Sequence, residues 1–176
     1  MLDTAPHWMV THQYDSRLVH VADGHYSRQK PGTRTCTPPG RKLLLITEEA
    51  SAIWVTSWPF AEFVKRVYPD AWLCTIFRRE KTCPFLASDL IREAVAITRW
   101  KYGEPPESGM ITMIDPRKVA PIKTHGTLNF GFVYKKVGFE HVGFTKRAGL
   151  HILQLTPERM PEPAAPIGAL WEVASC

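Results

Sequence analysis

The feature that most restricts the fold is a set of three short apolar runs, the first two of which are too close for a helix between them. Residues 42–47 (KLLLIT) and 52–58 (AIWVTSW) are separated by only the four residues 48–51. Such a short connection predicts an antiparallel hairpin, because a parallel crossover needs a dozen residues or more. Residues 71–77 (AWLCTIF) are a third run, typical of a buried strand. The sequence therefore predicts a sheet that is not purely parallel.

The clearest helical pattern covers residues 88–102, after a polar loop. Apolar side chains recur there at helical spacing, Ser88 or Asp89 can cap the first turn, and Gly103 predicts the end. The remaining pattern predicts helices at 15–26, 60–67 and 128–136, the last interrupted at Gly138, and strands at 110–114, 140–145 and 150–156. Hairpins combined with strand–helix–strand units predict an α+β fold, with one mixed sheet and helices on its faces.

The length of 176 residues and the apolar fraction of 44% fit a single domain with one core. We expect this domain at residues 1–156, comprising a basic segment at 15–41 and a core at 42–156. The Pro-rich residues 157–176 are expected to form a tail, either an ordered strap or a loose end.

No apolar stretch approaches the roughly 18 residues of a membrane span, and the N-terminus lacks a signal-peptide pattern. No CxxC pair occurs, which favours a reducing cytoplasm. The cysteines are Cys36, Cys74, Cys83 and Cys176.

The net charge of +5 is concentrated in two parts of the chain. The first runs from Arg17 to Lys42 with Asp23 as its single acid, and the second lies between Lys135 and Arg147. One interpretation is an ordinary solvated face. The other is a surface for a polyanion, either nucleic acid or the phosphates of a nucleotide cofactor. The basic residues are Arg17, Arg28, Lys30, Arg34, Arg41 and Lys42 in the first part, and Lys135, Lys136, Lys146 and Arg147 in the second.

The loop before the strongest helix has the composition of an anion site. Residues 78–87 (RREKTCPFLA) join the buried strand to the helix, whose first backbone N–H groups are unpaired and whose dipole is positive at this end. Arg78, Arg79 and Lys81 add positive charge. An ordinary strand–helix connection with a solvated loop is the alternative. The chain has no GxxxxGKS/T and no GxGxxG motif, so neither a P-loop nor a dinucleotide-binding fold is supported.

A second motif, YKKVGFEHVG, begins at Tyr134. Together with the order of elements before it (a hairpin, a strand, a loop, a long helix and a strand), it resembles the end-of-domain signature of the GNAT acyltransferases across residues 42–156. The resemblance implies an acetyl-CoA or related acyl-CoA cofactor, with its pyrophosphate on the loop and Tyr134 protonating the departing thiolate. The family's loop usually carries glycines, and this loop has none. The resemblance nominates the cofactor-binding residues Ile76, Phe77, Arg78, Arg79, Leu86, Ala87 and Ser88.

A third motif, HYSR at residues 25–28, precedes the GNAT-like part. The combination is similar to the Mom-type DNA modification proteins of bacteriophages and prophages, which elaborate the exocyclic amine of adenine in duplex DNA and so evade restriction. This resemblance implies that the protein works in the host cytoplasm and that duplex DNA is its partner. It leaves the oligomeric state open, and a homodimer is one of the alternatives. The implied catalytic residues are His25, Tyr26, Ser88, Asp115 and Tyr134. The implied DNA-binding residues are Ser27, Arg28, Lys30, Arg34 and Arg41.

The DNA hypothesis also requires an extruded adenine held against aromatic side chains. Mom-type proteins have in addition been linked to iron, although the candidate ligands do not follow a metal-ligand spacing. The pattern therefore predicts no metal site, and iron stays an alternative cofactor that only the resemblance implies. The aromatic candidates are Tyr26, Trp54, Trp58 and Phe60, and the metal-ligand candidates are His20, His25, His125, His141 and Asp115.

Several of the nominated residues have simpler explanations. Ser88 can cap its helix, Asp115 before a proline is a common start of a turn, and His25 with Asp115 forms a base-orienting pair only if the two meet in space. Three functions therefore stay open at this point. They are a DNA-modifying acyltransferase, a GNAT N-acetyltransferase of a small amine or protein lysine, and a DNA-binding module on a degenerate GNAT fold without activity.

Overall fold

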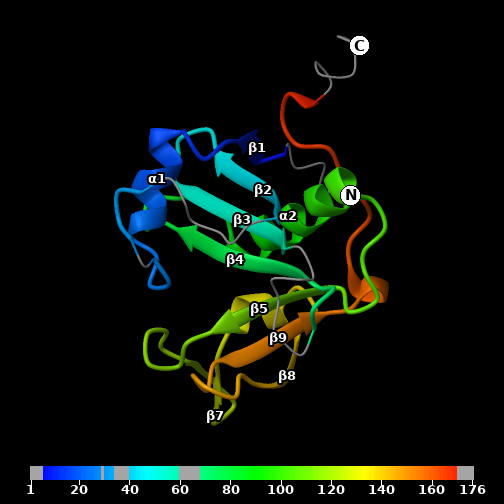
Figure 1. The fold of residues 1–176 in the computed structure, drawn as a ribbon. Coiled ribbons are helices and arrows are strands. Elements are labelled where there is room, and N and C mark those ends of the chain that lie inside the picture. The colour runs from blue at the N-terminus through cyan, green and yellow to red at the C-terminus, as the bar shows by residue number, and fades with distance from the viewer. Residues whose placement is uncertain (1–5, 29, 34–39, 60–67, 170–176) are drawn as a thin grey trace.

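The structure is a computed structural model that describes residues 6–28, 30–33, 40–59 and 68–169 (Figure 1). A seven-stranded sheet has the order β1-β2-β3-β4-β5-β9-β8, and a separate hairpin pairs β6 with β7. The prediction of an α+β fold with one large mixed sheet is confirmed. The elements are β1 (Trp8–Thr11), α1 (Ser16–Asp23), β2 (Gly40–Thr47), β3 (Ala52–Pro59), β4 (Trp72–Arg79), α2 (Ala87–Tyr102), β5 (Met110–Ile114), β6 (Ile122–Thr124), β7 (Thr127–Asn129), α3 (Phe132–Lys135), β8 (Glu140–Phe144), β9 (His151–Leu155) and a 3-10 turn at Pro157–Arg159.

The predicted hairpin is present as β2 and β3, which pair antiparallel with Leu44 opposite Val55. Alternate side chains of these strands enter two different cores, because successive residues of a strand point to opposite faces. Leu43 and Leu45 lie in the larger core with α2, whereas Leu44 lies in the smaller core with α1. In Figure 1 the two helices accordingly lie on opposite faces of this half of the sheet. Among the described residues, no helix is both long and apolar enough to cross a membrane.

Helix α2 begins one residue earlier than predicted, and its cap differs from the prediction. Leu86 is the N-cap, because its carbonyl accepts the N–H groups of Asp89 (3.1 Å) and Leu90 (3.0 Å). Ser88 and Asp89 therefore lie inside the first turn, and no side chain caps the helix. The predicted end is confirmed, since Gly103 has φ +80°, a conformation that glycine adopts without strain.

Strands β4 and β5 are parallel neighbours, joined through α2, but they pair over a short length only. Trp72–Cys74 pairs with Met110–Thr112, and beyond these residues the described strands diverge. A bulge in β4 accompanies the divergence: Val55 of β3 faces Ile76, the next residue Thr56 faces Cys74, and Thr75 is the extra residue. A bulge shifts the alternation of side chains by one position. Phe77 therefore packs on the same core as Cys74, whereas Ile76 packs on the core of α1.

The predicted helix at residues 128–136 is largely wrong. Residues 127–129 form β7, which pairs with β6, and only Phe132–Lys135 is helical. The reason is the two-residue turn His125–Gly126, where φ is +47° and +82°. Positive φ at both central residues is the type I′ geometry that closes tight hairpins, and histidine is an unusual residue there. The C-cap of α3 is Lys136, not Gly138, and β1 was not predicted at all.

The described part of the Pro-rich tail packs on the domain as an ordered strap. Met160 is buried in the larger core, Ala164 N–H donates to Ala96 of α2 (3.2 Å), and Ile167 N–H donates to Trp8 of β1 (2.8 Å). The predicted helix at 60–67, together with Phe60, Arg34, Cys36, Cys176 and the tail end from residue 170, lies outside the described residues.

Candidate functional site

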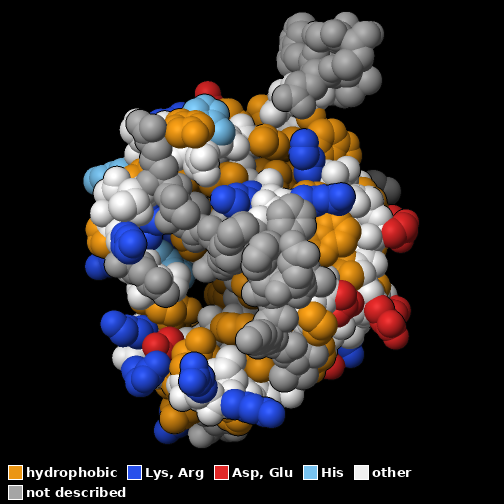
Figure 2. Space-filling model, viewed as in Figure 1, with side chains coloured by type: hydrophobic (Ala, Val, Ile, Leu, Met, Phe, Trp, Pro, Cys, Tyr) orange, Lys and Arg blue, Asp and Glu red, His pale blue; other side chains and the backbone are white. Residues whose placement is uncertain are grey.

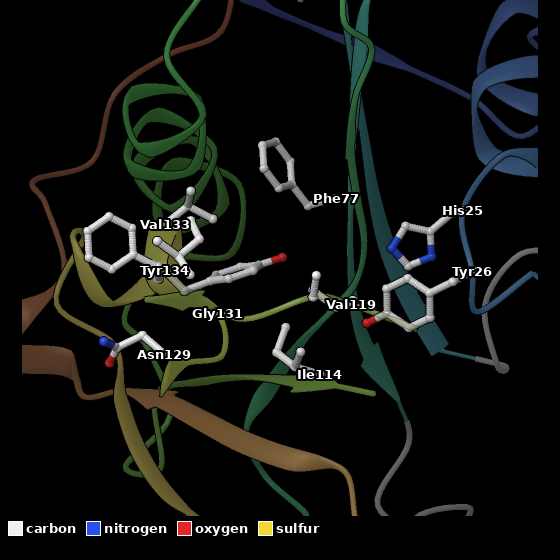
Figure 3. A pocket seen from close by; sticks show the side chains of 12 residues that line it. His25, Tyr26, Phe77, Ile114, Val119, Asn129, Gly131, Val133 and Tyr134 are labelled. Carbon is white, nitrogen blue, oxygen red and sulfur yellow. The ribbon is translucent and has the colours of Figure 1, made fainter. Parts of the chain in front are cut away.

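A cavity of ≈ 280 Å³ lies where β4 and β5 diverge (Figure 3). Its position at the carboxyl ends of two parallel strands is the usual place for a ligand in such sheets. Three of the five nominated catalytic residues, His25, Tyr26 and Tyr134, line it. His25 and Tyr26 approach from the turn after α1 and Tyr134 from α3, with Phe77 of β4 between them in Figure 3. The lining residues are His25, Tyr26, Phe77, Ile114, Val119, Ala120, Ile122, Asn129, Gly131, Phe132, Val133 and Tyr134.

Tyr134 is held deep in this site by buried neighbours. Its hydroxyl lies 3.7 Å from the sulfur of Cys74, and its ring packs edge-on against Phe77 at 6.2 Å. Burial raises the pKa of the Tyr134 hydroxyl well above its ordinary value, and the nearby Cys74 thiol raises it further. The hydroxyl therefore keeps its proton at neutral pH. It is suited to donate a proton or a hydrogen bond, and not to act as a base.

Cys74 is a site residue that the sequence reasoning missed. It is fully buried on β4, and burial raises the pKa of its thiol to about 12. A buried thiol that keeps its proton at neutral pH is a poor nucleophile, so Cys74 is not suited to covalent catalysis. The alternation of side chains along β4 places Cys74 on the same face as Trp72, and this can be read from the sequence. The contact with Tyr134 of α3 cannot, because it forms only when α3 packs on that face.

Tyr26 is fixed at the other side of the cavity. Its hydroxyl donates to the carbonyl of Met113 (3.1 Å), a backbone group of β5 beyond the last pair with β4. Its ring stacks on that of His25, with centroids 4.4 Å apart. The pairing of β4 with β5 has already ended here, so Tyr26 satisfies a backbone acceptor that the sheet leaves open.

Arg78 holds the His25–Tyr26 turn against β4. Its guanidinium donates to the carbonyl of Gly24 and to Glu80 (2.7 Å). A Cβ built on Gly24 would lie 2.6 Å from the guanidinium carbon, so the close approach depends on glycine. The Arg78 guanidinium was nominated as a phosphate contact, but it is bound to Gly24 and Glu80 and holds this turn instead.

His25 is expected to stay uncharged far below its ordinary pKa. Burial lowers the pKa of its imidazole to about 4, and the charge of Arg78 lowers it further. The folded pKa lies below the ordinary value of about 6.5, so protonation favours the unfolded state, and stability falls as pH drops from about 6.5 towards 4. In an NMR titration the His25 ring signals should keep their neutral shifts down to about pH 5, and Arg78→Gln should raise the pKa. Titration of both proteins near 6.5 would contradict this assignment.

The loop before α2 keeps part of its capacity to bind an anion. Arg79 donates to the carbonyls of Phe85 and Cys83, both at 2.7 Å, and so organises the loop in place of glycines. The N–H groups of Ala87 and Ser88 have no acceptor among the described residues. Leu86, at the N-cap, is 66% exposed. This end of α2 can therefore hold a phosphate through backbone N–H groups. The Ile76 side chain faces the α1 core, so only the backbone of Ile76 is open to a cofactor.

Two nominated catalytic residues lie apart from the cavity lining. Ser88 is in the first turn of α2, and the carboxylate of Asp115 is bound by Arg117 (2.8 Å). His25 bonds to Ser27 (2.7 Å) through Nδ1. The base-orienting pair of His25 and Asp115 is therefore not formed.

The nominated DNA-binding residues are mostly engaged within the protein. Arg28 is almost fully buried, with 4% of its side chain exposed, and pairs with Asp23 (2.8 Å). Arg41 lies over the ring of Trp58 at 5.0 Å, while Lys30 is exposed. Of the aromatic clamp candidates among the described residues, only Tyr26 lines the cavity, since Trp54 is fully buried. Trp58 packs against Trp72 in another part of the core.

The described residues do not fit a resident metal ion, because they contain no group of three or more His, Cys, Asp or Glu side chains that could hold one. His25, the only metal-ligand candidate in the cavity lining, is there with Asn129 and tyrosines but no carboxylate. We therefore derive no chemical step through a metal.

No protein-family model, no curated protein and no solved structure matches the chain. The fold and the site together define a mixed α+β domain with a largely apolar cavity between two diverging parallel strands.

Proposed function

We propose that the protein is a GNAT-type acyltransferase of the Mom type, which transfers an acyl group from acetyl-CoA or a related thioester to the exocyclic amine of adenine in duplex DNA. The observation that carries the proposal is the cavity, because it unites the HYSR segment and the YKKVGFEHVG segment. His25 and Tyr26 come from the first and Tyr134 from the second, and Tyr134 lies 108 positions after Tyr26. These are the two motifs on which the Mom-type and GNAT resemblances depend.

The topology supports the acyltransferase part of the proposal. A hairpin leads to β4, the loop and the long helix α2 follow, and β5 returns parallel to β4. Beyond Cys74 the described edge of β4 that faces β5 is not paired in the sheet, so its backbone groups can bond to the amides of a thioester cofactor. The N–H groups of Ala87 and Ser88 at the start of α2 are unpaired among the described residues, so they can bind the pyrophosphate of this cofactor.

The acceptor part of the proposal depends on the charge of the cavity wall. No acidic side chain is among the lining residues of the described chain, and most of them are apolar. A lysine or a polyamine would enter as a cation and would need a carboxylate to offset its lost hydration. Adenine is neutral and aromatic, and its ring can stack against Tyr26. A neutral heteroaromatic amine therefore fits this wall better than a cationic amine does.

Two side chains suit the proton transfers of such a reaction. A bound acyl-CoA would supply an activated thioester. His25, neutral at physiological pH, can accept a proton from the attacking amine. Tyr134, protonated and buried, can give its proton to the departing sulfur. Tyr26, fixed on Met113, positions the acceptor ring.

Two measurements distinguish the proposed enzyme from the two other functions, namely thermal unfolding with acetyl-CoA and mass spectrometry of nucleosides. An acetyltransferase of small amines and the proposed enzyme should both be stabilised by acetyl-CoA in thermal unfolding, because a ligand that binds only the folded state raises the melting temperature. A binding module without activity, which the glycine-free loop and the engaged Arg79 favour, should show no such shift. Of the three, only the proposed enzyme should produce a modified adenosine in the DNA of a host that expresses it, as measured by mass spectrometry of digested nucleosides.

A further inference from the structure

We propose that duplex DNA is held by a basic surface around the mouth of the cavity, formed by the loop after β5, the β6–β7 hairpin and the β8–β9 turn, and not by the basic N-terminal segment. The inference rests on the proposed function for its choice of partner. Its four phosphate-contacting residues, called the mouth cations here, are Lys118, Lys123, Lys146 and Arg147. All four are exposed.

The charge of this part of the molecule is strongly one-sided. Residues 115–151 contain seven Lys and Arg residues and only two acids. Both acids are already paired, Asp115 with Arg117 (2.8 Å) and Glu140 with Arg159 (2.6 Å). None of the mouth cations forms an ion pair within the described chain. Figure 2 shows Lys and Arg side chains gathered over the lower part of the molecule, the part where Figure 1 labels β7 and β8.

The sheet register brings the mouth cations to the same end as the cavity. Ile114, the last residue of β5, is opposite His151, the first residue of β9. The loop that carries Lys118 and the turn that carries Lys146 and Arg147 therefore leave the sheet at one edge. Phe130 stacks on His151 at 4.5 Å, which ties the chain after the β6–β7 hairpin to this edge as well.

The β6–β7 hairpin links the surface to the cavity itself. Ile122 and Asn129 are opposite each other and both line the cavity, whereas Lys123 is opposite Leu128, which is 61% exposed. Residues that are directly opposite share a face, and neighbouring residues alternate between faces. One face of the hairpin is thus a wall of the cavity, and the other presents a cation and an apolar side chain outwards. A duplex bound there would have its bases next to the cavity.

Among its described residues, the N-terminal segment offers fewer available charges. Arg28 is buried on Asp23, and Arg17 is paired with Asp15 at 2.9 Å. Arg41 lies over Trp58. A side chain that already holds an internal partner must give it up before it binds a phosphate. The four unpaired mouth cations need no such exchange, and this difference favours them as the phosphate contacts.

The test measures the salt dependence of binding to a duplex of about 20 base pairs. Each phosphate contact contributes about 0.9 to the slope of log affinity against log salt. Replacing all four mouth cations by Gln should therefore lower the slope by about 3 to 4 and weaken binding about 100-fold or more at 0.1 M salt. The control variant removes the same charge elsewhere, by Lys30→Gln, Lys81→Gln, Arg92→Gln and Lys101→Gln, and should keep the slope.

The outcomes separate this inference from the proposed function. A control variant that loses the slope while the first variant keeps it would overturn the inference, as would binding to phosphatidylserine vesicles in place of the duplex. If adenine is still modified after the mouth cations are removed and binding is unchanged, the surface is wrong and the function stands. If the duplex binds through the mouth cations and no modified adenosine forms, the surface stands and the function is wrong.

Discussion

Tyr134→Phe is expected to slow acyl transfer to duplex DNA by about 100-fold or more while the protein stays folded. General acid catalysis typically contributes factors of about 10² to 10⁴, and the substitution removes the only proton that this side chain can give. The phenylalanine keeps the edge-on packing on Phe77 and loses only the long contact to the Cys74 sulfur and the interaction with Thr112. The loss of stability should therefore stay near 1 kcal/mol. Rates are measured with labelled acetyl-CoA, and stability by denaturant unfolding.

Tyr102→Phe is the matched control, because it removes the same atom from another tyrosine whose hydroxyl is buried. The Tyr102 hydroxyl is buried with no hydrogen-bond partner among the described residues, in an aromatic group with Trp58 and Trp72. Removing an unpartnered buried hydroxyl should be neutral or stabilising, and it should leave the transfer rate unchanged. Equal rates for the two variants would contradict the assigned role of Tyr134.

Gly109→Ala is expected to cause the largest loss of stability among the glycine substitutions, about 3 to 5 kcal/mol. Gly109 has φ +63°, and a Cβ there would lie 2.1 Å from the carbonyl oxygen of Leu155. The left-handed conformation and the forced displacement of a backbone group each cost about 1 to 3 kcal/mol. The displaced group belongs to the β5–β9 pair, and Gly109 also accepts the N–H of Trp72 (2.9 Å). Denaturant unfolding measures the effect.

Gly126→Ala separates the two contributions. Gly126 has a similar φ of +82°, but nothing lies within 4 Å of its Cβ position. Its substitution should therefore cost only the conformational part, about 1 to 2 kcal/mol. If the two alanine variants were equally stable, the close approach of β9 to Gly109 would not exist in solution.

Patterns local in the sequence predicted most of the fold. The runs at 42–47 and 52–58 with four residues between them were sufficient for the hairpin, and helical spacing with Gly103 was sufficient for α2. The β6–β7 hairpin was missed because its turn uses His125–Gly126, so the only local signal was one glycine. Strand β1 was missed because it is short and gains its stability from pairing with β2, which is distant in sequence.

The candidate site could be predicted only in part. Motifs nominated His25, Tyr26 and Tyr134, and these three meet in the cavity. The partners that set their properties could not be predicted, since Cys74 touches Tyr134 only through the packing of α3 on β4. Arg78 shows the opposite error: its charge and its position in a basic loop indicated a phosphate contact, but a missing side chain at Gly24 lets it bind the protein instead.

The most direct test of the central claim is mass spectrometry of nucleosides from the DNA of a host that expresses the protein. The proposed function predicts an adenosine with added mass on its exocyclic amine when the wild-type protein or Tyr102→Phe is expressed. It predicts little or none with Tyr134→Phe at equal protein level. If the wild-type protein accumulates in its folded form and all adenosine stays unmodified, the claim that the protein transfers an acyl group to DNA at this cavity is contradicted.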